Sequence, residues 1–179
     1  LARFKPDVII NTAAMTNVDA CETQRDECWN LNVNAVAYFI EAIQSLHSIH
    51  AYNPHFIHLS TDFIFDGTKG PLTEDEIPNP LSFYAESKLA AEKLLQESSI
   101  SWAIARTVLV YGIADNMSRS NIVLWAKSAL EQNKKINVVD DQFRTPTLAE
   151  DLAEGCIKIA CQKAKGIFNI SGKDYMSIL

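Results

Sequence analysis

The sequence predicts an α/β fold, in which a doubly wound and mostly parallel sheet has helices on both faces. Short β-branched runs alternate with longer helix-forming stretches along the chain. This alternation is typical of right-handed β–α–β units, in which each helix returns the chain to a parallel strand. At 179 residues and 47% hydrophobic content, the chain is long enough for one domain with a sizeable core.

Strands are predicted wherever apolar and β-branched residues form a short run. The first of these runs, Asp7-Val8-Ile9-Ile10-Asn11-Thr12, is typical of a buried strand. In chain order, the predicted strands cover residues 7–12, 56–60, 102–111, 136–139 and 167–170.

Helices are predicted between the strands, where good helix formers follow capping residues. Asn79 is the expected N-cap of the helix that contains Tyr84, with Pro80 at its first position. Thr147 is the expected N-cap of the last helix, because Glu150 at position N3 completes a capping box. The predicted helices cover residues 24–50, 80–95, 120–133 and from 147 to about 161.

Tyr84 and Lys88 are the most informative pair of residues in the chain. Residues four apart lie on one face of a helix, and Ala91 and Leu95 continue that face as an apolar stripe. Partial burial beside an ammonium is expected to lower the pKa of Tyr84 from about 10, so that it exchanges a proton with a carbonyl or alcohol oxygen. A Tyr beside a Lys is more often a surface pair, so further evidence is needed.

Polar residues follow three of the predicted strands. They are Asn11-Thr12-Ala13-Ala14, Ser60-Thr61-Asp62 and Tyr111-Gly112. The carboxyl ends of parallel strands meet at one edge of a sheet, where ligands bind in open α/β folds. Three polar strand ends that converge with the Tyr84 helix are more specific than the Tyr–Lys spacing alone.

Composition excludes several classes of function. A formal net charge of -6 and a pI near 5.2, without a Lys/Arg cluster, argue against nucleic acid as a partner. No apolar run approaches the roughly 18 residues that span a membrane. The first residues lack the apolar core of a signal peptide. We therefore expect a cytoplasmic protein with neither a nucleic-acid nor a membrane partner.

The cysteines and histidines do not form a recognisable metal or redox motif. No C-x-x-C pair is present, and the histidines lack a neighbouring set of Cys or acidic ligands. We interpret the cysteines as reduced and half-buried, and the histidines as structural or surface residues. These residues are Cys21, Cys28, Cys156, Cys161, His47, His50, His55 and His58.

Five features in order resemble an extended short-chain dehydrogenase/reductase, a family with a Rossmann-like fold. They are Asn11-Thr12-Ala13-Ala14, Asn32 in Leu31-Asn32-Val33-Asn34-Ala35, Ser60-Thr61-Asp62, Tyr84 with Lys88, and Arg106-Thr107 with Val110-Tyr111-Gly112.

Within this superfamily, the chain most resembles dTDP-4-dehydrorhamnose reductases. The similarity runs through nearly all 179 residues, and the string Ser60-Thr61-Asp62-Phe63-Ile64-Phe65-Asp66-Gly67 is its most distinctive part. Tyr84 to Glu92 and Val138 to Thr147 contain further matching segments.

The resemblance implies that NADPH or NADH reduces the 4-keto group of a nucleotide-linked 6-deoxyhexose. It implies that Tyr84 is the proton donor, that Lys88 lowers the pKa of Tyr84 and binds the nicotinamide ribose, and that Thr61 polarises the substrate carbonyl. Such donors belong where charge develops on the oxygen. Thr61 could instead cap a turn.

The resemblance also implies binding residues, a possible Mg²⁺ ion with no assignable ligands, and a possible homodimer. Asn32 would be the family's structural and proton-relay asparagine, or only a brace for its helix. The implied cofactor-binding residues are Asn11, Thr12, Ala13, Ala14, Asn32, Ser60, Tyr84 and Lys88. The implied substrate-binding residues are Thr61, Asp62, Tyr111, Gln142 and Arg144.

Two departures from the family pattern stand out. None of the six glycines forms the G-x-x-G-x-x-G loop that seats a pyrophosphate. We therefore expect residues 1–179 to be a partial NAD(P)-binding reductase domain that lacks its N-terminal strands, with sugar-nucleotide-binding elements mainly in 112–179. Arg144 stands where family members more often have Gly, which affects the expected sugar nucleotide.

Two other functional classes stay open. A non-catalytic binding subunit, like the regulatory subunit of methionine adenosyltransferase, would use the same fold. An epimerase or dehydratase is a third possibility, but dehydratases usually have a second acid where Phe63 follows Asp62. The complete set of Thr61, Tyr84 and Lys88 favours an enzyme.

Overall fold

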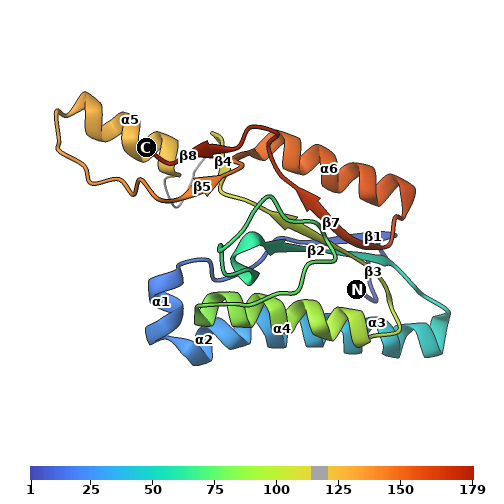
Figure 1. Ribbon diagram of the computed structural model, residues 1–179. Helices are drawn as coiled ribbons and strands as arrows, with labels where there is room; N and C mark the ends of the chain where they lie inside the picture. The colour runs from blue at the N-terminus through green and yellow to red at the C-terminus, as the bar shows by residue number, and fades with distance from the viewer. Residues whose placement is uncertain (114–120) are drawn as a thin grey trace. The chain divides into compact units, whose positions relative to one another are not determined.

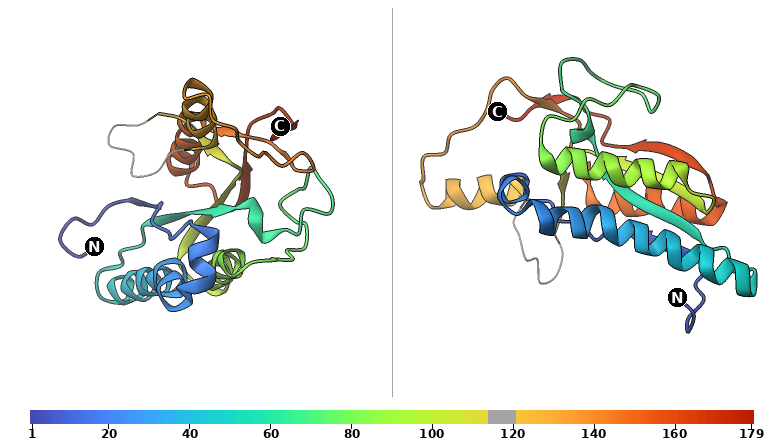
Figure 2. Two further views of the ribbon diagram at one scale, coloured as in Figure 1. Left: turned by 90° about the vertical axis from the view of Figure 1, so that its left-hand side faces the viewer. Right: turned by 90° about the horizontal axis from the view of Figure 1, so that it is seen from below.

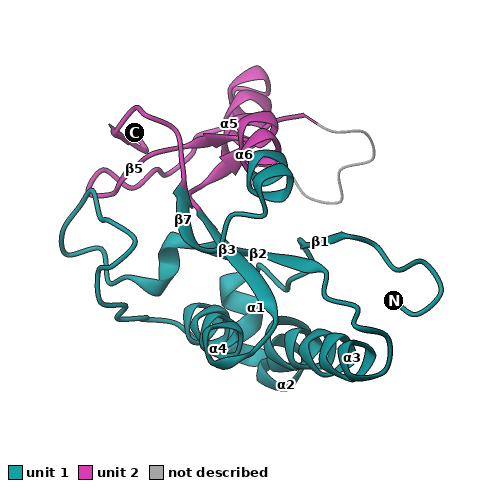
Figure 3. Cartoon of the chain, turned by 90° about the vertical axis from the view of Figure 1, so that its right-hand side faces the viewer, with its two compact units in different colours: residues 1–106, 156–169 teal, residues 107–155, 170–179 magenta. Residues whose placement is uncertain are grey.

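The computed structural model describes residues 1–113 and 121–179 (Figure 1, Figure 2). These residues form two compact units, which are described separately (Figure 3). Unit 1 contains residues 1–106 and 156–169, and unit 2 contains residues 107–155 and 170–179. Residue 120, at the start of the helix predicted over 120–133, lies outside the described residues, and a helix is present over Ile122–Glu131.

A four-stranded sheet forms the centre of unit 1 (Figure 1). The strand order is β1-β2-β3-β7, and β1 runs parallel to β2 with Asn11 opposite His58. The predicted doubly wound, mostly parallel architecture is confirmed. The strands are β1 (Val8–Asn11), β2 (His55–Thr61), β3 (Ser101–Thr107) and β7 (Gly166–Ile170).

Helices cover both faces of this sheet. α3 and α4 lie side by side on one face, and residues 156–162 of α6 lie on the other (Figure 1, Figure 3). The predicted helix over 24–50 is three segments, because a π-helical turn, η1, interrupts it. The helices of this unit are α1 (Val18–Thr23), α2 (Arg25–Trp29), η1 (Asn30–Asn34), α3 (Ala35–His50), the 3-10 turn η2 (Asp62–Ile64), α4 (Phe83–Glu97) and part of α6 (Ala149–Gln162).

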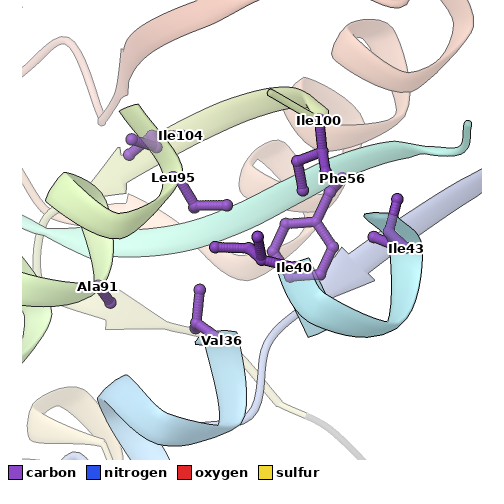
Figure 4. Packing of buried hydrophobic residues seen from close by; sticks show 8 residues of the cluster. All are labelled: Val36, Ile40, Ile43, Phe56, Ala91, Leu95, Ile100 and Ile104. Carbon is purple, nitrogen blue, oxygen red and sulfur yellow. The ribbon is translucent and has the colours of Figure 1, made fainter. Parts of the chain in front are cut away.

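The main core of unit 1 lies between the sheet and the α3/α4 layer (Figure 4). Phe56 of β2 is fully buried, and its ring lies 5.4 Å from that of Phe39, centroid to centroid. The apolar stripe predicted for α4 is confirmed, because Ala91 and Leu95 are both fully buried in this cluster. Its buried members are Val36, Ile40, Ile43, Phe56, Ala91, Leu95, Ile100 and Ile104.

The helix that contains Tyr84 begins later than predicted. Ser82, not Asn79, is the N-cap, and its hydroxyl accepts a hydrogen bond from the Ala85 N–H at 3.3 Å. The Asn79 side chain instead donates to Asp66 at 3.0 Å, and its N–H donates to the Ile64 carbonyl. Asn79 is therefore committed to the preceding loop. Asp66 also accepts hydrogen bonds from the N–H and the hydroxyl of Thr68, so its carboxylate organises this loop.

A buried ion pair joins β3 to α4. Arg106 donates to both carboxylate oxygens of Glu92, at 3.1 and 2.7 Å, and Glu92 is fully buried. Arg106 also donates to the Glu74 carbonyl at 3.0 Å and lies over the ring of Phe65. The guanidinium of Arg106 thus fastens the loop after β2 to the sheet.

Unit 2 contains two small sheets, one whole helix and the first half of another. β4 pairs with β6 in parallel, and β5 pairs with β8 in antiparallel. Its elements are β4 (Val110–Tyr111), α5 (Ile122–Glu131), β5 (Phe143–Arg144), β6 (Thr147–Leu148), the first half of α6, and β8 (Met176–Ser177).

Three predictions for this part of the chain are wrong. Residues 102–111 form two strands, because Leu109 has a positive φ of 38° that interrupts the extended backbone. Residues 136–139 are not a strand. Thr147 does not cap α6, since it belongs to β6 and its hydroxyl donates to the Val108 carbonyl at 2.6 Å.

No helix in residues 1–113 or 121–179 is long and apolar enough to cross a membrane.

Candidate active site

Tyr84 and Lys88 lie on the buried face of α4, as predicted. Their side chains are 7% and 3% exposed, respectively. The Tyr84 ring packs edge-on against Phe63, with 5.8 Å between the centroids. The surface-pair alternative is therefore wrong for these two residues.

Thr61 brings a second hydroxyl to Tyr84. It is the last residue of β2, it is buried, and its hydroxyl shares a hydrogen bond with the Tyr84 hydroxyl. The same oxygen accepts the Phe63 N–H and bonds to the Asp62 carboxylate, both at 3.2 Å. Thr61 thus caps the η2 turn, as the second interpretation of this residue expected, and also contacts the phenol. Its part in polarising a substrate carbonyl stays a prediction.

The expected lowering of the Tyr84 pKa is not observed. Burial raises the pKa of Tyr84 to about 12, although the hydrogen bond with Thr61 opposes that rise. The negative charge of Asp62 raises it further. Tyr84 is therefore a protonated phenol at neutral pH, a state that can donate a proton.

Lys88 is held deep inside unit 1. Its ammonium nitrogen donates to the Leu59 carbonyl at 2.6 Å and lies 3.2 Å from Nε2 of His58. Burial lowers the pKa of Lys88 to about 8, and the nearby Glu92 partly opposes that shift. The side chain still has a positive charge at neutral pH, but it titrates much closer to neutrality than an exposed lysine.

His58 is a site residue that the sequence interpretation missed. Its Nδ1 lies 3.2 Å from the Asn11 amide nitrogen, while its Nε2 faces Lys88. The side chain is 1% exposed, and burial followed by the charge of Lys88 keeps its pKa well below the usual value. A signal was available, because strand alternation places His58 on the same face as Ser60.

Asn32 braces the site from the π-helical turn. Its side-chain oxygen accepts the Met15 N–H at 2.8 Å, and its amide nitrogen donates to the Met15 carbonyl at 3.1 Å. The same nitrogen donates to Ser87 at 2.9 Å, and Ser87 in turn donates to the Tyr84 carbonyl at 2.7 Å. Single π turns often occur at functional sites. The bracing role proposed for Asn32 is thus observed.

Two buried cysteines complete the surroundings of Tyr84. Cys21 and Cys28 are fully buried in one cluster with the tyrosine. Burial raises the pKa of Cys21 to about 12, and its contact with Cys28 adds to the effect. All four cysteines are free thiols, of which only Cys161 is exposed.

The loop after β1 is open at two of the residues that are expected to contact a dinucleotide. Asn11 is buried and its side-chain oxygen accepts the Ala13 N–H at 3.2 Å, while Thr12 and Ala13 are exposed. Ser60 at the end of β2 is buried, and its hydroxyl has no hydrogen-bond partner among the described residues. An open loop of small residues and an unsatisfied hydroxyl are suited to a polar ligand.

The other predicted substrate residues belong to unit 2. Tyr111 lies in β4 and Arg144 in β5, and an Arg144 guanidinium nitrogen lies 3.5 Å from the Gln142 side-chain oxygen. Their part in substrate binding stays a prediction. Across residues 1–113 and 121–179, no group of three or more His, Cys, Asp or Glu side chains could hold a metal ion.

Comparison with known families identifies the chain. The model of the RmlD substrate binding domain matches residues 1–179. The chain belongs to this family.

Three relatives show which known proteins this RmlD-family chain resembles. Methionine adenosyltransferase 2 subunit beta of Rattus norvegicus is 31% identical over 179 residues, which cover 97% of this chain and 52% of the relative. A dTDP-4-dehydrorhamnose reductase structure from Clostridium acetobutylicum is 32% identical, with a TM-score of 0.87 over 98% of this chain and 59% of that one. The corresponding reductase from Bacillus anthracis, in complex with NADP, is 27% identical with a TM-score of 0.86, again over 98% and 59%.

This RmlD-family chain therefore spans only about half the length of the relatives that it matches. The resemblance to dTDP-4-dehydrorhamnose reductases is confirmed at the level of family and fold. The similarity to structures of reductases supports a sugar-nucleotide reductase family, whereas the similarity to a methionine adenosyltransferase subunit leaves the individual role open.

Proposed function

We propose that the protein reduces the 4-keto group of a nucleotide-linked 6-deoxyhexose, as in dTDP-rhamnose biosynthesis, with NADPH or NADH as the reductant. The observation that supports this most is the burial of Thr61, Tyr84 and Lys88 where β2 packs against α4 in unit 1. All three are buried, and two of them are hydroxyls joined by a hydrogen bond.

The two hydroxyls suit a carbonyl that becomes an alcohol. Addition of hydride to the carbonyl carbon leaves negative charge on oxygen, so donors positioned at that oxygen lower the barrier. Thr61 would hold the carbonyl oxygen and Tyr84, which is protonated, would donate the proton. A protonated hydroxyl is a weak nucleophile at neutral pH, so neither Thr61 nor Tyr84 would form a covalent adduct with the ketone.

The residues proposed to hold the nicotinamide cofactor lie beside this pair. Bound NADPH would supply the hydride. The Lys88 ammonium would bind its ribose, the free Ser60 hydroxyl would offer a further contact, and the loop from Asn11 to Ala14 would lie along the groove. Asn32 would keep α4 and this loop in place through Ser87 and Met15.

The test is consumption of NADPH by the complete protein with dTDP-4-dehydro-6-deoxyhexose. We expect NADPH oxidation that depends on the sugar nucleotide, together with formation of the reduced sugar. NADPH binding that is never followed by sugar-dependent oxidation would contradict the substrate assignment. Replacing the sugar nucleotide with its already reduced form is the matched control.

A second candidate function is a non-catalytic binding subunit. The observation that favours it is the 31% identity to methionine adenosyltransferase 2 subunit beta across this chain. The two candidates are separated by mixing the protein with a methionine adenosyltransferase and measuring co-elution. Co-elution without NADPH-dependent reduction would favour the subunit. The expected homodimer is tested by size-exclusion chromatography of the protein alone, which gives the mass of the species in solution.

A further inference from the structure

A chain of hydrogen bonds links the loop after β1 to Lys88. The Ala13 N–H donates to the Asn11 side-chain oxygen at 3.2 Å, and the Asn11 amide nitrogen lies 3.2 Å from Nδ1 of His58. Nε2 of His58 lies 3.2 Å from Nζ of Lys88, which donates to the Leu59 carbonyl at 2.6 Å. These contacts place a buried imidazole between the candidate cofactor loop and the candidate catalytic lysine.

The chemistry of the four groups determines the direction of each bond. Neutral histidine has one N–H donor and one acceptor nitrogen. The Asn11 amide nitrogen can only donate, so Nδ1 of His58 must accept and Nε2 must have the proton. Nε2 can then donate only to a Lys88 nitrogen with a free lone pair, that is, to a neutral amine. The observed arrangement is therefore fully satisfied when Lys88 is uncharged.

Protonation of Lys88 reverses the direction of the Lys88–His58 and His58–Asn11 hydrogen bonds. An ammonium has no lone pair, so Lys88 must donate to Nε2 of His58. The Nε2 proton passes to Lys88, a proton from solvent is taken up at Nδ1, and the histidine stays neutral. Nδ1–H then needs an acceptor, which the Asn11 side chain supplies by turning its oxygen toward the ring. The Ala13 N–H loses its acceptor in this state.

We propose that His58 is a positioning residue that couples the protonation state of Lys88 to the backbone N–H of Ala13. When Lys88 is charged, the Ala13 N–H is free to donate to a ligand in the loop after β1. When Lys88 is neutral, Asn11 holds that N–H. If the proposed function is correct, the charged lysine and the free N–H would be presented to the cofactor together.

The surrounding charges are consistent with titration of Lys88 in an accessible range. Burial lowers the pKa of Lys88 to about 8, while Glu92 of α4 and Cys28 of α2 oppose that shift. Glu92 is itself paired with Arg106 of β3. In addition to burial, the charges of Asp62 and Cys21 raise the pKa of Tyr84 rather than that of Lys88. His58 is the titratable neighbour on β2, and burial keeps it neutral.

The test is the tautomer of His58, read from long-range ¹H–¹⁵N spectra of the protein labelled at its histidine nitrogens. The spectra are recorded from about pH 6.5 to about pH 9.5, and a His58→Gln variant assigns the signal among the four histidines. We expect the Nδ1–H tautomer at low pH and the Nε2–H tautomer at high pH, with a midpoint near the Lys88 pKa of about 8. One tautomer throughout this range overturns the proposal.

Two variants sharpen the test. Lys88→Met removes the titrating group and should make the tautomer independent of pH. Asn11→Asp is isosteric and offers only acceptor oxygens, so it should keep the Nδ1–H tautomer across the whole range. A tautomer change that persists in either variant, with circular dichroism like that of wild type, also overturns the proposal. The readout requires no turnover, so a failed reductase assay and a failed tautomer switch are distinguishable results.

Discussion

Tyr84 lies inside the protein as a protonated phenol whose oxygen contacts Thr61. Replacing it with Phe removes the proton donor and leaves the ring packing on Phe63 intact. We expect Tyr84→Phe to lower turnover by about 100-fold, the usual scale for a lost general acid. Steady-state NADPH oxidation measures this, and Tyr38→Phe at an exposed tyrosine is the matched control. Wild-type turnover in Tyr84→Phe would remove Tyr84 from the mechanism.

Thr61 caps η2 and is proposed to hold the substrate oxygen, and a pair of substitutions can separate these two roles. Thr61→Val keeps the side-chain shape but loses the hydroxyl, so we expect turnover to fall by about 100-fold, as when one donor to a developing oxyanion is lost. NADPH affinity, measured by fluorescence titration, should change little. Thr61→Ser retains the hydroxyl and should stay close to wild type. A collapse of NADPH binding in Thr61→Val would show that capping of η2 is its main role.

Single residues also show where sequence reasoning stops. The burial of Tyr84 and Lys88 could be predicted because helical spacing places them on an apolar stripe. The pKa of Tyr84 could not, because its shift depends on how completely the ring is enclosed. Strand alternation could place His58 on the same face as Ser60, but its partners could not be predicted, since Asn11 and Lys88 are distant in sequence and meet His58 only in the folded sheet.

At the scale of elements, the start of α4 depends on a local cap. Ser82 satisfies the Ala85 N–H, which would otherwise have no partner in the first turn. We expect Ser82→Ala to lower the free energy of unfolding by about 1 kcal/mol, measured by urea denaturation. Ser45→Ala, at an exposed position within α3, serves as the control. Equal stability of the two variants would contradict the assignment of Ser82 as the cap.

β3 and α4 depend on the ion pair between Arg106 and Glu92. Arg106→Met leaves a fully buried carboxylate without its partner, and we expect a loss of about 3–5 kcal/mol in the free energy of unfolding. The double variant Arg106→Met with Glu92→Leu should recover much of that loss, because no buried charge is left. Urea denaturation of the single and double variants measures the difference. A double variant no more stable than Arg106→Met would argue against this account.

Element positions were predictable where pattern and packing agree. The strands around residues 7–12, 56–60 and 167–170 and the polar ends of the first two could be predicted from β-branched runs alone. Long-range contacts decided the rest. Asn79 binds Asp66 instead of capping α4, and Thr147 reaches the Val108 carbonyl instead of capping α6. Neither contact has a signal within its own sequence window.

At the scale of the whole molecule, Lys88 makes stability depend on pH. The folded protein loses the Lys88 proton near pH 8, whereas the unfolded chain keeps it to about pH 10.5. Between these values the unfolded chain binds more protons, so a rise in pH increases the free energy of unfolding. The full effect of such a shift is on the order of 3 kcal/mol.

Lys88→Met isolates this contribution from those of other groups whose pKa differs between the folded protein and the unfolded chain, such as the Cys21 thiol. We expect wild type to gain stability relative to Lys88→Met as the pH rises from about 7 to about 10. Urea denaturation of both proteins at several pH values gives the difference. A constant difference across this range would mean that Lys88 does not have a lowered pKa.

The labelling rates of the buried thiols can measure how often their surroundings unfold locally. Only Cys161 is exposed, whereas Cys21 and Cys28 are buried against Tyr84. A maleimide added to the native protein should therefore label one site rapidly. Modification of Cys21 and Cys28 would follow the local opening of α1 and α2, so the rate of their labelling reports on motion beside the candidate catalytic tyrosine without any introduced probe.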